Sequence, residues 1–288
     1  MLTRRFVLAG LGGLGLAGTL QPAWPLAGSL AGSLAGSPAG PDLANKRELL
    51  TALARMRGAT DERLCIGYVV GARYAVPVHK AIPMMGILAG TFSQYRRISD
   101  DAFEARALEI AYFTDLETGQ LLEKWKNPVT GTTVDVPLTR MGPSRVILTA
   151  DGLTVPQLSG EAKGLALKHI FQPPVTVGDD VWITEQINID GPPGPRPFVY
   201  NELSTYHAHR SDLADPGRAT VPTQVQYQSL ITYRSWMGFG DTPGHTLARG
   251  AGTRAATIAD LPPYYVELTR RLHPDVLKDP LAILATAP

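Results

Sequence analysis

The chain lacks the features that identify several large classes of protein. Its 288 residues include one cysteine, Cys65, so neither an intramolecular disulfide nor a paired-cysteine zinc motif can form. The sequence also has no Gly-rich phosphate loop and no Gly-x-Ser-x-Gly nucleophile elbow. The net charge of +1 leaves no electrostatic footprint for nucleic acid. These absences exclude the commonest nucleotide enzymes, serine hydrolases, Cys-ligated metal proteins and nucleic-acid-binding proteins.

The amino terminus has the pattern of an export signal. Arg4 and Arg5 form a twin arginine, and a glycine-rich apolar stretch follows from Phe6 to Leu20. A bilayer span needs roughly 20 apolar residues, so we expect no stable membrane span in the mature protein. A retained membrane or amphipathic helix is the alternative. The Leu-Ala-Gly-Ser repeats over 26–37 predict a low-complexity spacer. We therefore expect residues 1–41 to be a twin-arginine signal peptide and spacer, and the mature protein to be periplasmic or secreted.

The rest of the chain has the composition of a globular protein rich in turns, with 44% apolar residues and 24 prolines. A helix is predicted over Leu43 to Arg57, where Leu49, Leu50, Leu53 and Met56 have helical spacing. A second amphipathic helix is predicted over Tyr264 to Leu272. Between them the pattern alternates with a period of two, and it predicts strands at 107–115, 120–127, 132–138, 144–149, 181–190, 198–209 and 223–236.

These elements predict a mainly β protein. An open sheet of this size would leave costly edges, so we expect the antiparallel sheet to be barrel-like or folded into two packed layers. Short helices would lie at its N- and C-terminal ends. We expect residues 42–288 to form a single domain, and a homo-oligomer is possible.

Ordered motifs run from about residue 45 to the C-terminus. They are Ala54-Arg-Met-Arg-Gly58, Asp115-Leu-Glu-Thr-Gly119, Trp125-Lys-Asn-Pro128 with Thr130-Gly131, Asp179-Asp-Val-Trp-Ile-Thr-Glu185, Glu202 with Thr205-Tyr-His207, and Asp212-Leu-Ala-Asp215. In these motifs the chain resembles the family catalogued as domain of unknown function 1838. The resemblance implies an exported single-domain protein and no settled activity. By analogy with other exported families, it also implies a calycin-like or lipocalin-like barrel that takes terpenoid or aromatic small molecules.

Glu185 is the first candidate catalytic residue. If the strand is regular, this carboxylate lies in the middle of an aliphatic face formed by Val181, Ile183, Ile187 and Ile189. A carboxylate in such a place should have a raised pKa unless it is paired, and that is the profile of a general acid or base. The alternative is a structural ion pair with an internal arginine such as Arg145 or Arg106.

The next candidates lie on the strand 198–209. One face carries Tyr200, Glu202, Ser204 and Tyr206. If this face lines the interior of a barrel, Glu202 and Tyr206 become candidate acid/base groups, and Tyr200 a candidate substrate-binding residue. The alternative is a buried hydrogen-bond network that fixes the register of the strand.

The opposite face of this strand carries His207 and His209, whose His-x-His spacing points both imidazoles the same way. A metal site needs a third ligand, which the sequence does not identify, so we predict no bound metal and no other cofactor. His207 is instead a candidate proton carrier, since the unperturbed pKa of histidine is about 6.5.

Four further residues are candidates for substrate binding: Trp125, Asn127, Arg145 and Tyr227. Trp125 and Asn127 share a strand face and Arg145 is suited to clamp an anionic group. For the aromatic residues a role in the core, and for Arg145 an ordinary ion pair, is the alternative.

Three functions stay open on this evidence. The first is a cofactor-independent lyase, isomerase or hydratase that acts by acid/base chemistry on a small hydrophobic terpenoid or aromatic molecule. The second is an exported protein that binds such a molecule without chemistry. The third is a metal-dependent enzyme that uses the His-x-His strand. The first two differ in whether titratable groups converge on one ligand atom.

Overall fold

Long antiparallel strands dominate the structure, a computed structural model that describes residues 40–156, 163–193 and 197–288. The predicted signal peptide and spacer lie almost wholly outside these residues. In chain order the elements are α1 (Lys46–Arg57), β1 (Cys65–Val76), β2 (Ile82–Ser99), β3 (Ala102–Thr114), β4 (Lys124–Lys126), β5 (Thr133–Asp135), β6 (Thr139–Thr149), β7 (Gly152–Thr154), β8 (Leu167–Phe171), β9 (Val175–Val177), β10 (Asp180–Asp190), β11 (Val199–His209), α2 (Arg210–Ala214), β12 (Gln224–Thr232), η2 (Ser235–Met237), β13 (His245–Ala255), η3 (Ile258–Asp260), α3 (Pro263–Leu272), α4 (Pro274–Lys278) and α5 (Pro280–Leu284).

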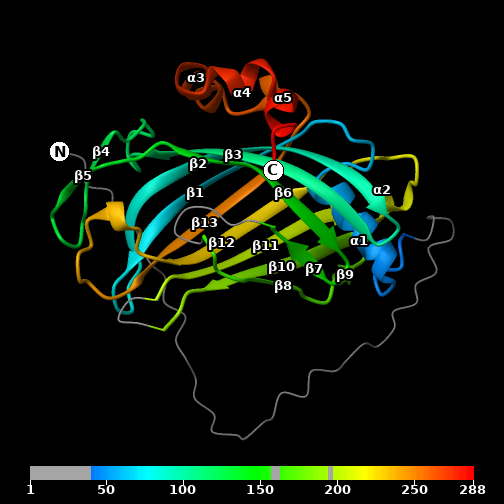
Figure 1. The fold of residues 1–288 in the computed structure, drawn as a ribbon, viewed down its shortest axis with the longest axis horizontal. Helices are drawn as coiled ribbons and strands as arrows, with labels where there is room; N and C mark the ends of the chain where they lie inside the picture. Colours follow the sequence, from blue (N-terminus) through cyan, green and yellow to red (C-terminus); the bar gives the residue numbers. More distant parts are fainter. Residues whose placement is uncertain (1–39, 157–162, 194–196) are drawn as a thin grey trace, which may run out of the picture. The chain divides into compact units, whose positions relative to one another are not determined.

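The strands form a nearly closed, barrel-like antiparallel sheet, as the sequence predicts. Its order is β7-β6-β3-β2-β1-β13-β12-β11-β10-β8, and β9 also pairs with β10. The two ends of this order meet at a seam, where Gly152 of β7 lies against His169 of β8. Figure 1 shows the strands curling round a common interior. Closure of this kind removes the exposed edges that a large open sheet would have.

The registers place alternate residues of each strand inside or outside the sheet. Tyr200 pairs with Ile189 on β10 and with Ile231 on β12, and Glu202 pairs with Ile187 and Ser229. Because successive side chains of a strand point to opposite faces, these residues share one face. This face is the inner one, since its continuation along the strands, at Val181, Ile183 and Ala208, packs on the helix inside the sheet.

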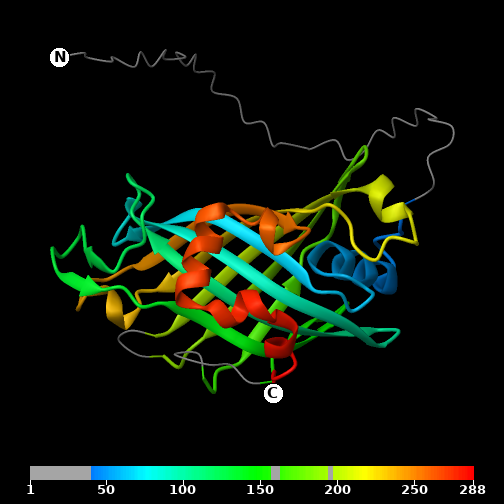
Figure 2. The ribbon, with the colours of Figure 1, turned by 90° about the horizontal axis from the view of Figure 1, so that it is seen from above.

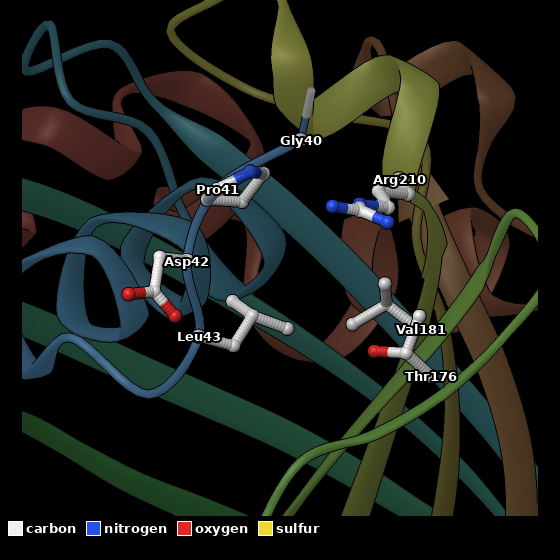
Figure 3. Close-up of a pocket in the computed structure, with 7 residues that line it drawn as sticks. All are labelled: Gly40, Pro41, Asp42, Leu43, Thr176, Val181 and Arg210. Atoms are coloured by element: carbon white, nitrogen blue, oxygen red, sulfur yellow. The ribbon is translucent and has the colours of Figure 1, made fainter. Parts of the chain in front are cut away.

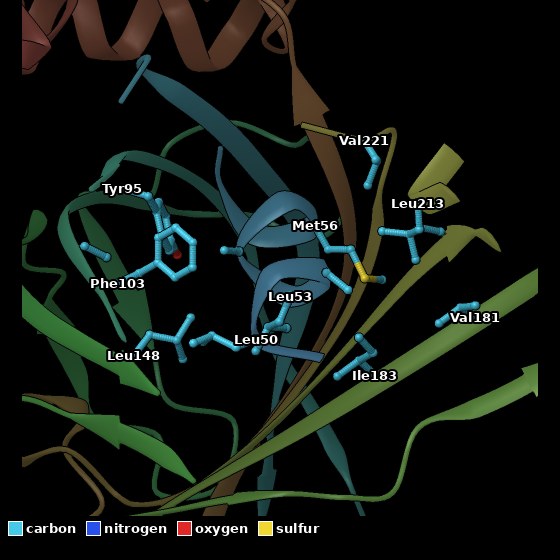
Figure 4. Close-up of a cluster of buried hydrophobic side chains, with 14 of the residues drawn as sticks. Leu50, Leu53, Met56, Tyr95, Phe103, Leu148, Val181, Ile183, Leu213 and Val221 are labelled. Atoms are coloured by element: carbon cyan, nitrogen blue, oxygen red, sulfur yellow. The ribbon is translucent and has the colours of Figure 1, made fainter. Parts of the chain in front are cut away.

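Helix α1 fills one end of the interior. Asn45 caps its first turn by accepting hydrogen bonds from the backbone N–H groups of Arg47 and Glu48. Its apolar side chains Leu50, Leu53 and Met56 are buried against the strands around them (Figure 4). The predicted helix is therefore confirmed, although it begins at Lys46 rather than at Leu43.

The opposite end is closed by the β4–β5 hairpin and the segment around η2. Trp125 and Phe239 are buried there, with Met85, Phe113 and Met237. Of the predicted strand 120–127, Lys124–Lys126 forms β4, and it pairs with Thr133–Asp135 of the predicted strand 132–138.

Helices α3–α5 cover the outer face of β1–β3, as Figures 1 and 2 show. The side chains they cover include Leu88, Phe92, Leu108, Ile110 and Tyr112, which pack against Tyr265, Leu268, Val276 and Leu284. These outward strand positions are apolar because the helices remove them from water. Within the described residues, each helix falls short of the length and apolar character that crossing a membrane requires.

Helix α3 packs so closely on the sheet that position 90 has no room for a side chain, and Gly90 occupies it. A Cβ atom at this position would lie 2.3 Å from the hydroxyl oxygen of Tyr265, a fully buried side chain. We expect Gly90→Ala to lower the free energy of unfolding by about 1–3 kcal/mol, because the ring has no room to move. Gly67→Ala is the matched control, since a Cβ there would meet its nearest atom at 3.8 Å. Urea denaturation of both variants checks this, and equal effects would contradict it.

Candidate functional site

Polar and ionisable side chains gather on the inner face of the sheet. We call this set the polar interior, and it consists of the residues Arg57, Arg73, Glu109, His169, Glu185, Tyr200, Glu202, Tyr206 and Tyr227. Apart from Arg57, which ends α1, all come from strands, and strand register turns each of them inward. The structure thus brings together the predicted site residues Glu185, Glu202, Tyr200, Tyr206 and Tyr227.

Glu185 lies at the centre of a network beside α1. Its Oε2 accepts a hydrogen bond from Arg57 Nη1 at 2.6 Å and lies 2.9 Å from Nε2 of His169. Its Oε1 accepts from the Tyr206 hydroxyl at 2.9 Å. We call these four residues the Glu185 cluster. Both carboxylate oxygens are occupied by partners, so this group is fixed in place.

The pKa of Glu185 differs from the expectation. Burial acts to raise it, but the charge of Arg57 and the hydrogen bonds from His169 and Tyr206 outweigh burial, and the pKa is lowered. The ion-pair alternative names the wrong arginines: Arg145 and Arg106 both pair with Glu104 on the outer face. The actual partner, Arg57, comes from the helix inside the sheet.

Glu202 lies on the neighbouring strand β11, where it pairs with Ile187 of β10. Its Oε2 accepts a hydrogen bond from Tyr200, and its Oε1 accepts one from Ser204 at 3.1 Å. Its pKa is raised because burial disfavours its charge, and the negative charge of Glu185 acts in the same direction. A raised pKa was predicted for Glu185. The structure gives the raised pKa to Glu202 instead, and the pKa of Glu185 is lowered.

Glu109 on β3 is a functional candidate that sequence reasoning missed. Its pKa is raised to about 7, because burial and the negative charge of Glu202 outweigh the opposing charge of Arg73. The nearby Nε of Arg73 is buried and has no hydrogen-bond partner among the residues that the structure describes. Burial also raises the pKa of Tyr227 to about 12, so this phenol stays protonated at neutral pH. We call Arg73, Glu109, Tyr200, Glu202 and Tyr227 the Glu202 cluster.

The Glu202 cluster is only partly buried. Its five side chains point inward, and each belongs to a residue that keeps part of its surface accessible. The inward-facing apolar residues Val69 and Ile187 also keep part of their surface accessible. Side chains at this level are therefore less completely buried than at the end occupied by α1, where Leu50, Leu53 and Met56 are almost wholly buried.

A separate pocket of about 490 Å³ opens beside the start of α1 (Figure 3). It is lined by Gly40, Pro41, Asp42, Leu43, Thr176, Val181 and Arg210. None of the polar-interior residues is among them. Asp42 and Arg210 are its ionisable side chains, and this pocket lacks the converging carboxyl and phenol groups of the interior.

The structure does not bring the other predicted residues into the interior. His207 lies on the outer face, where its Nε2 is 2.7 Å from Asp180 Oδ1. Arg145 Nε donates to Glu104 Oε2 at 2.6 Å, also outside. His207 was predicted to be a proton carrier and Arg145 a substrate-binding residue, and strand alternation places both side chains on the face opposite to the polar interior.

Trp125 and Asn127 are buried in the cap formed by the β4–β5 hairpin. Trp125 donates its indole N–H to the carbonyl oxygen of Met84 at 3.2 Å. Asn127 donates to the carbonyl oxygen of Met237 at 2.9 Å and accepts from the backbone N–H of Val129 at 2.8 Å. These bonds hold the hairpin against η2, which is the core role that sequence analysis kept as an alternative for Trp125.

Some of the missed residues left a signal in the sequence. Glu109 interrupts an otherwise apolar strand, as Glu185 does, and the same argument applies to it. Arg57 follows Met56 at the end of the predicted helix, but nothing local indicates that this end lies inside a barrel. His169 shares a strand face with Leu167 and Phe171, on a short strand that was not predicted.

Comparison with known proteins adds no relative to this description. No protein-family model matches the chain, and no curated protein matches it.

Proposed function

We propose that the protein is an exported, cofactor-independent enzyme that transfers a proton on a small molecule held in the polar interior. The reaction class is a lyase, isomerase or hydratase reaction. The observation that carries the proposal is Glu109, a carboxyl group with a pKa of about 7 that faces the interior of a nearly closed sheet beside Glu202 and Arg73. A general acid or base works best when its pKa lies close to the operating pH.

In this proposal the Glu185 cluster has a structural role and the Glu202 cluster transfers protons. In the Glu185 cluster a carboxylate of lowered pKa is held by Arg57, His169 and Tyr206, so it anchors α1 and the strands and has little freedom to exchange a proton. In the Glu202 cluster, two carboxyl groups with raised pKa values act on each other through their charges. When groups interact in this way, one carboxyl group keeps its proton while the other ionises, which supplies an acid and a base in one site.

The Glu202 cluster also supplies groups that orient a ligand. The protonated phenol of Tyr227 already donates to the Ser229 hydroxyl at 2.9 Å, so its oxygen remains free to accept a hydrogen bond. The buried Nε of Arg73, which has no partner within the described part of the chain, is a donor for a carbonyl, hydroxyl or carboxylate oxygen. We infer a substrate with one oxygen-bearing head group and an apolar remainder that lies against Val69 and Ile187. A terpenoid or aromatic alcohol, ketone or acid has this chemistry.

A protein that only binds such a molecule is the second candidate, because the same groups hold a ligand without reacting. Proton exchange distinguishes the two. Native mass spectrometry of protein purified from its own source would first identify a co-purified small molecule. The molecule would then be incubated with the protein in D₂O, because an acid/base enzyme transfers solvent deuterium to carbon and a binding protein does not.

We expect Glu109→Gln to slow this deuterium incorporation by a factor of about 100, the lower range for loss of a general acid or base. Glutamine keeps the shape and removes the titrating group. Glu104→Gln is the matched control, since Glu104 lies on the same strand and faces outward to Arg96, Arg106 and Arg145. Incorporation at the wild-type rate in Glu109→Gln would remove this carboxyl from the mechanism. A ligand that binds without any deuterium incorporation would favour the binding protein.

A further inference from the structure

A second group of candidate ligands lies on the outside of the sheet, apart from the polar interior. His207 and His209 project from the same face of β11, and Asp180 of β10 is the register partner of His209. The sequence predicts the two imidazoles as a pair but does not identify a third ligand. Strand pairing supplies it, because it places a carboxylate from a different part of the chain beside both rings.

The separations of these groups suit a single metal ion. One ligand atom from each of Asp180, His207 and His209 lies within 4.8 Å of the other two. Asp180 Oδ1 is 2.7 Å from His207 Nε2 and 3.4 Å from His209 Nδ1. Around a tetrahedral zinc ion with bonds of about 2.0–2.2 Å, neighbouring ligand atoms lie roughly 3.3–3.5 Å apart. One separation already has this value, and rotation of partly exposed side chains adjusts the others.

Trp182 and Asp179 border the two imidazoles. The ring of Trp182 stacks on His207 with centroids 5.0 Å apart, which holds that imidazole in position. Asp179 Oδ2 lies 3.7 Å from His209 Nδ1, too far for a hydrogen bond, and Asp179 is itself fixed by two hydrogen bonds from Ser211, at 2.8 and 2.7 Å. Its negative charge therefore lies beside the site and favours a bound cation.

The site is open to solvent on one side. The side chain of His207 is 22% exposed, that of Asp180 41% and that of His209 54%. A metal held by three protein ligands at such a surface keeps a position for water or for another molecule. A wholly structural zinc site, by contrast, has four protein ligands and is closed.

We propose that Asp180, His207 and His209 form a binding site for a divalent transition-metal ion. Two imidazole nitrogens and one carboxylate oxygen are the donor set that suits Zn²⁺ and its neighbours in the first transition row, rather than Ca²⁺ or Mg²⁺, which prefer oxygen ligands. The site lies on the face opposite to the polar interior, so this proposal can be tested independently of the proposed enzyme activity.

Calorimetric titration of the full chain with Zn²⁺ tests the proposal, with protein that carries no histidine tag. We expect one ion per chain, and at least a ten-fold loss of affinity in each of Asp180→Asn, His207→Ala and His209→Ala. His79→Ala is the matched control, because His79 is exposed and belongs to no such group among the described residues. This control should bind as the wild type does. Circular dichroism confirms that each variant is folded.

Fluorescence locates the bound ion. Cu²⁺ quenches nearby indoles, so it should quench the share of the emission that comes from Trp182 and leave the emission of Trp182→Phe nearly unchanged. Absence of stoichiometric Zn²⁺ binding would overturn the proposal. Binding that survives in both His207→Ala and His209→Ala, or Cu²⁺ quenching that is the same in Trp182→Phe as in the wild type, would overturn it as well.

Discussion

Replacement of Arg57 by methionine is expected to lower the free energy of unfolding at pH 7 by about 3–5 kcal/mol, the usual cost when one partner of a buried ion pair is removed. The side chain of Glu185 is 2% exposed, and that of Arg57 is 19% exposed. Without the guanidinium, the carboxylate keeps only His169 and Tyr206 as partners. Methionine preserves most of the volume, so the measured loss reports the charge.

The pH dependence of this loss gives a sharper test. In the wild-type protein the lowered pKa of Glu185 stabilises the fold above the pKa of the unfolded chain, and this contribution disappears as the pH falls. In Arg57→Met the buried Glu185 is expected to have a raised pKa, so stability falls as the pH rises. The difference between the two proteins should therefore grow from pH 4 to pH 7.

A double-mutant cycle isolates the pair from the rest of the network. We expect Arg57→Met combined with Glu185→Gln to be more stable than the sum of the two single losses predicts, because the double variant buries no unpaired charge. Urea denaturation of the four proteins measures this coupling. Additive losses, or a difference that does not change with pH, would show that Arg57 and Glu185 do not stabilise each other.

Glu109→Gln is expected to make the protein more stable at pH 8, by up to about 3 kcal/mol, since one pKa unit corresponds to 1.36 kcal/mol. In the folded protein burial raises the pKa of Glu109 from 4.5 to about 7. A carboxyl group with a raised pKa makes the folded state lose stability as the pH rises from about 4.5 to about 7. Glutamine carries no charge and avoids this loss. At pH 4 the two proteins should be equally stable.

Glu104→Gln should behave in the opposite way. The pKa of Glu104 is lowered despite its burial, because the hydrogen bond and charge of Arg145, and the charges of Arg96 and Arg106, favour the ionised form. Its contribution to stability is present above the pKa of the unfolded chain and is lost as the pH falls, so this variant should be less stable than the wild type at neutral pH. Urea denaturation between pH 4 and pH 8 measures both. If Glu109→Gln were less stable than the wild type at pH 8, this would contradict the inference that ionisation of Glu109 lowers the stability of the folded protein.

Strands whose two faces differ clearly were predictable from the sequence. The strand predicted at 181–190 became Asp180–Asp190, and its aliphatic positions with Glu185 point inward as a set. The neighbouring prediction at 198–209 became Val199–His209, and it placed Glu202 and Tyr206 on one face correctly. Such patterns extend over many residues, and a slip by one position would turn every side chain to the wrong face.

The inner face of β3 was harder to predict. Leu108, Ile110 and Tyr112 form its more apolar face, which a two-residue period alone would place in the core of a barrel. In the structure this face is the outer one and is buried under α3–α5, while Glu109 points inward. Periodicity shows that a strand has two faces, but it does not show which one a distant helix covers.

The partners of the buried charged residues could not be predicted from the neighbouring sequence either. Arg57 and Glu185 are 128 residues apart, and they meet only because α1 enters the sheet. His169 reaches the same carboxylate from a five-residue strand that carries little sequence signal. Trp125 and Asn127 looked like pocket residues because aromatic and amide groups suit ligands, and the same properties suit a buried hairpin cap.

The cover over β1–β3 has a consequence for the order in which the chain becomes stable during synthesis. Helices α3–α5 come after β13 in the sequence. A ribosome therefore completes the described strands before the helices that cover the apolar outer face of β1–β3. Until these helices emerge, Leu88, Phe92 and Leu108 face water together, and surfaces of this kind attract other chains. A nascent or prematurely terminated chain without α3–α5 would therefore bind chaperones or associate with other copies of itself. The chain would become soluble once these helices cover the apolar face.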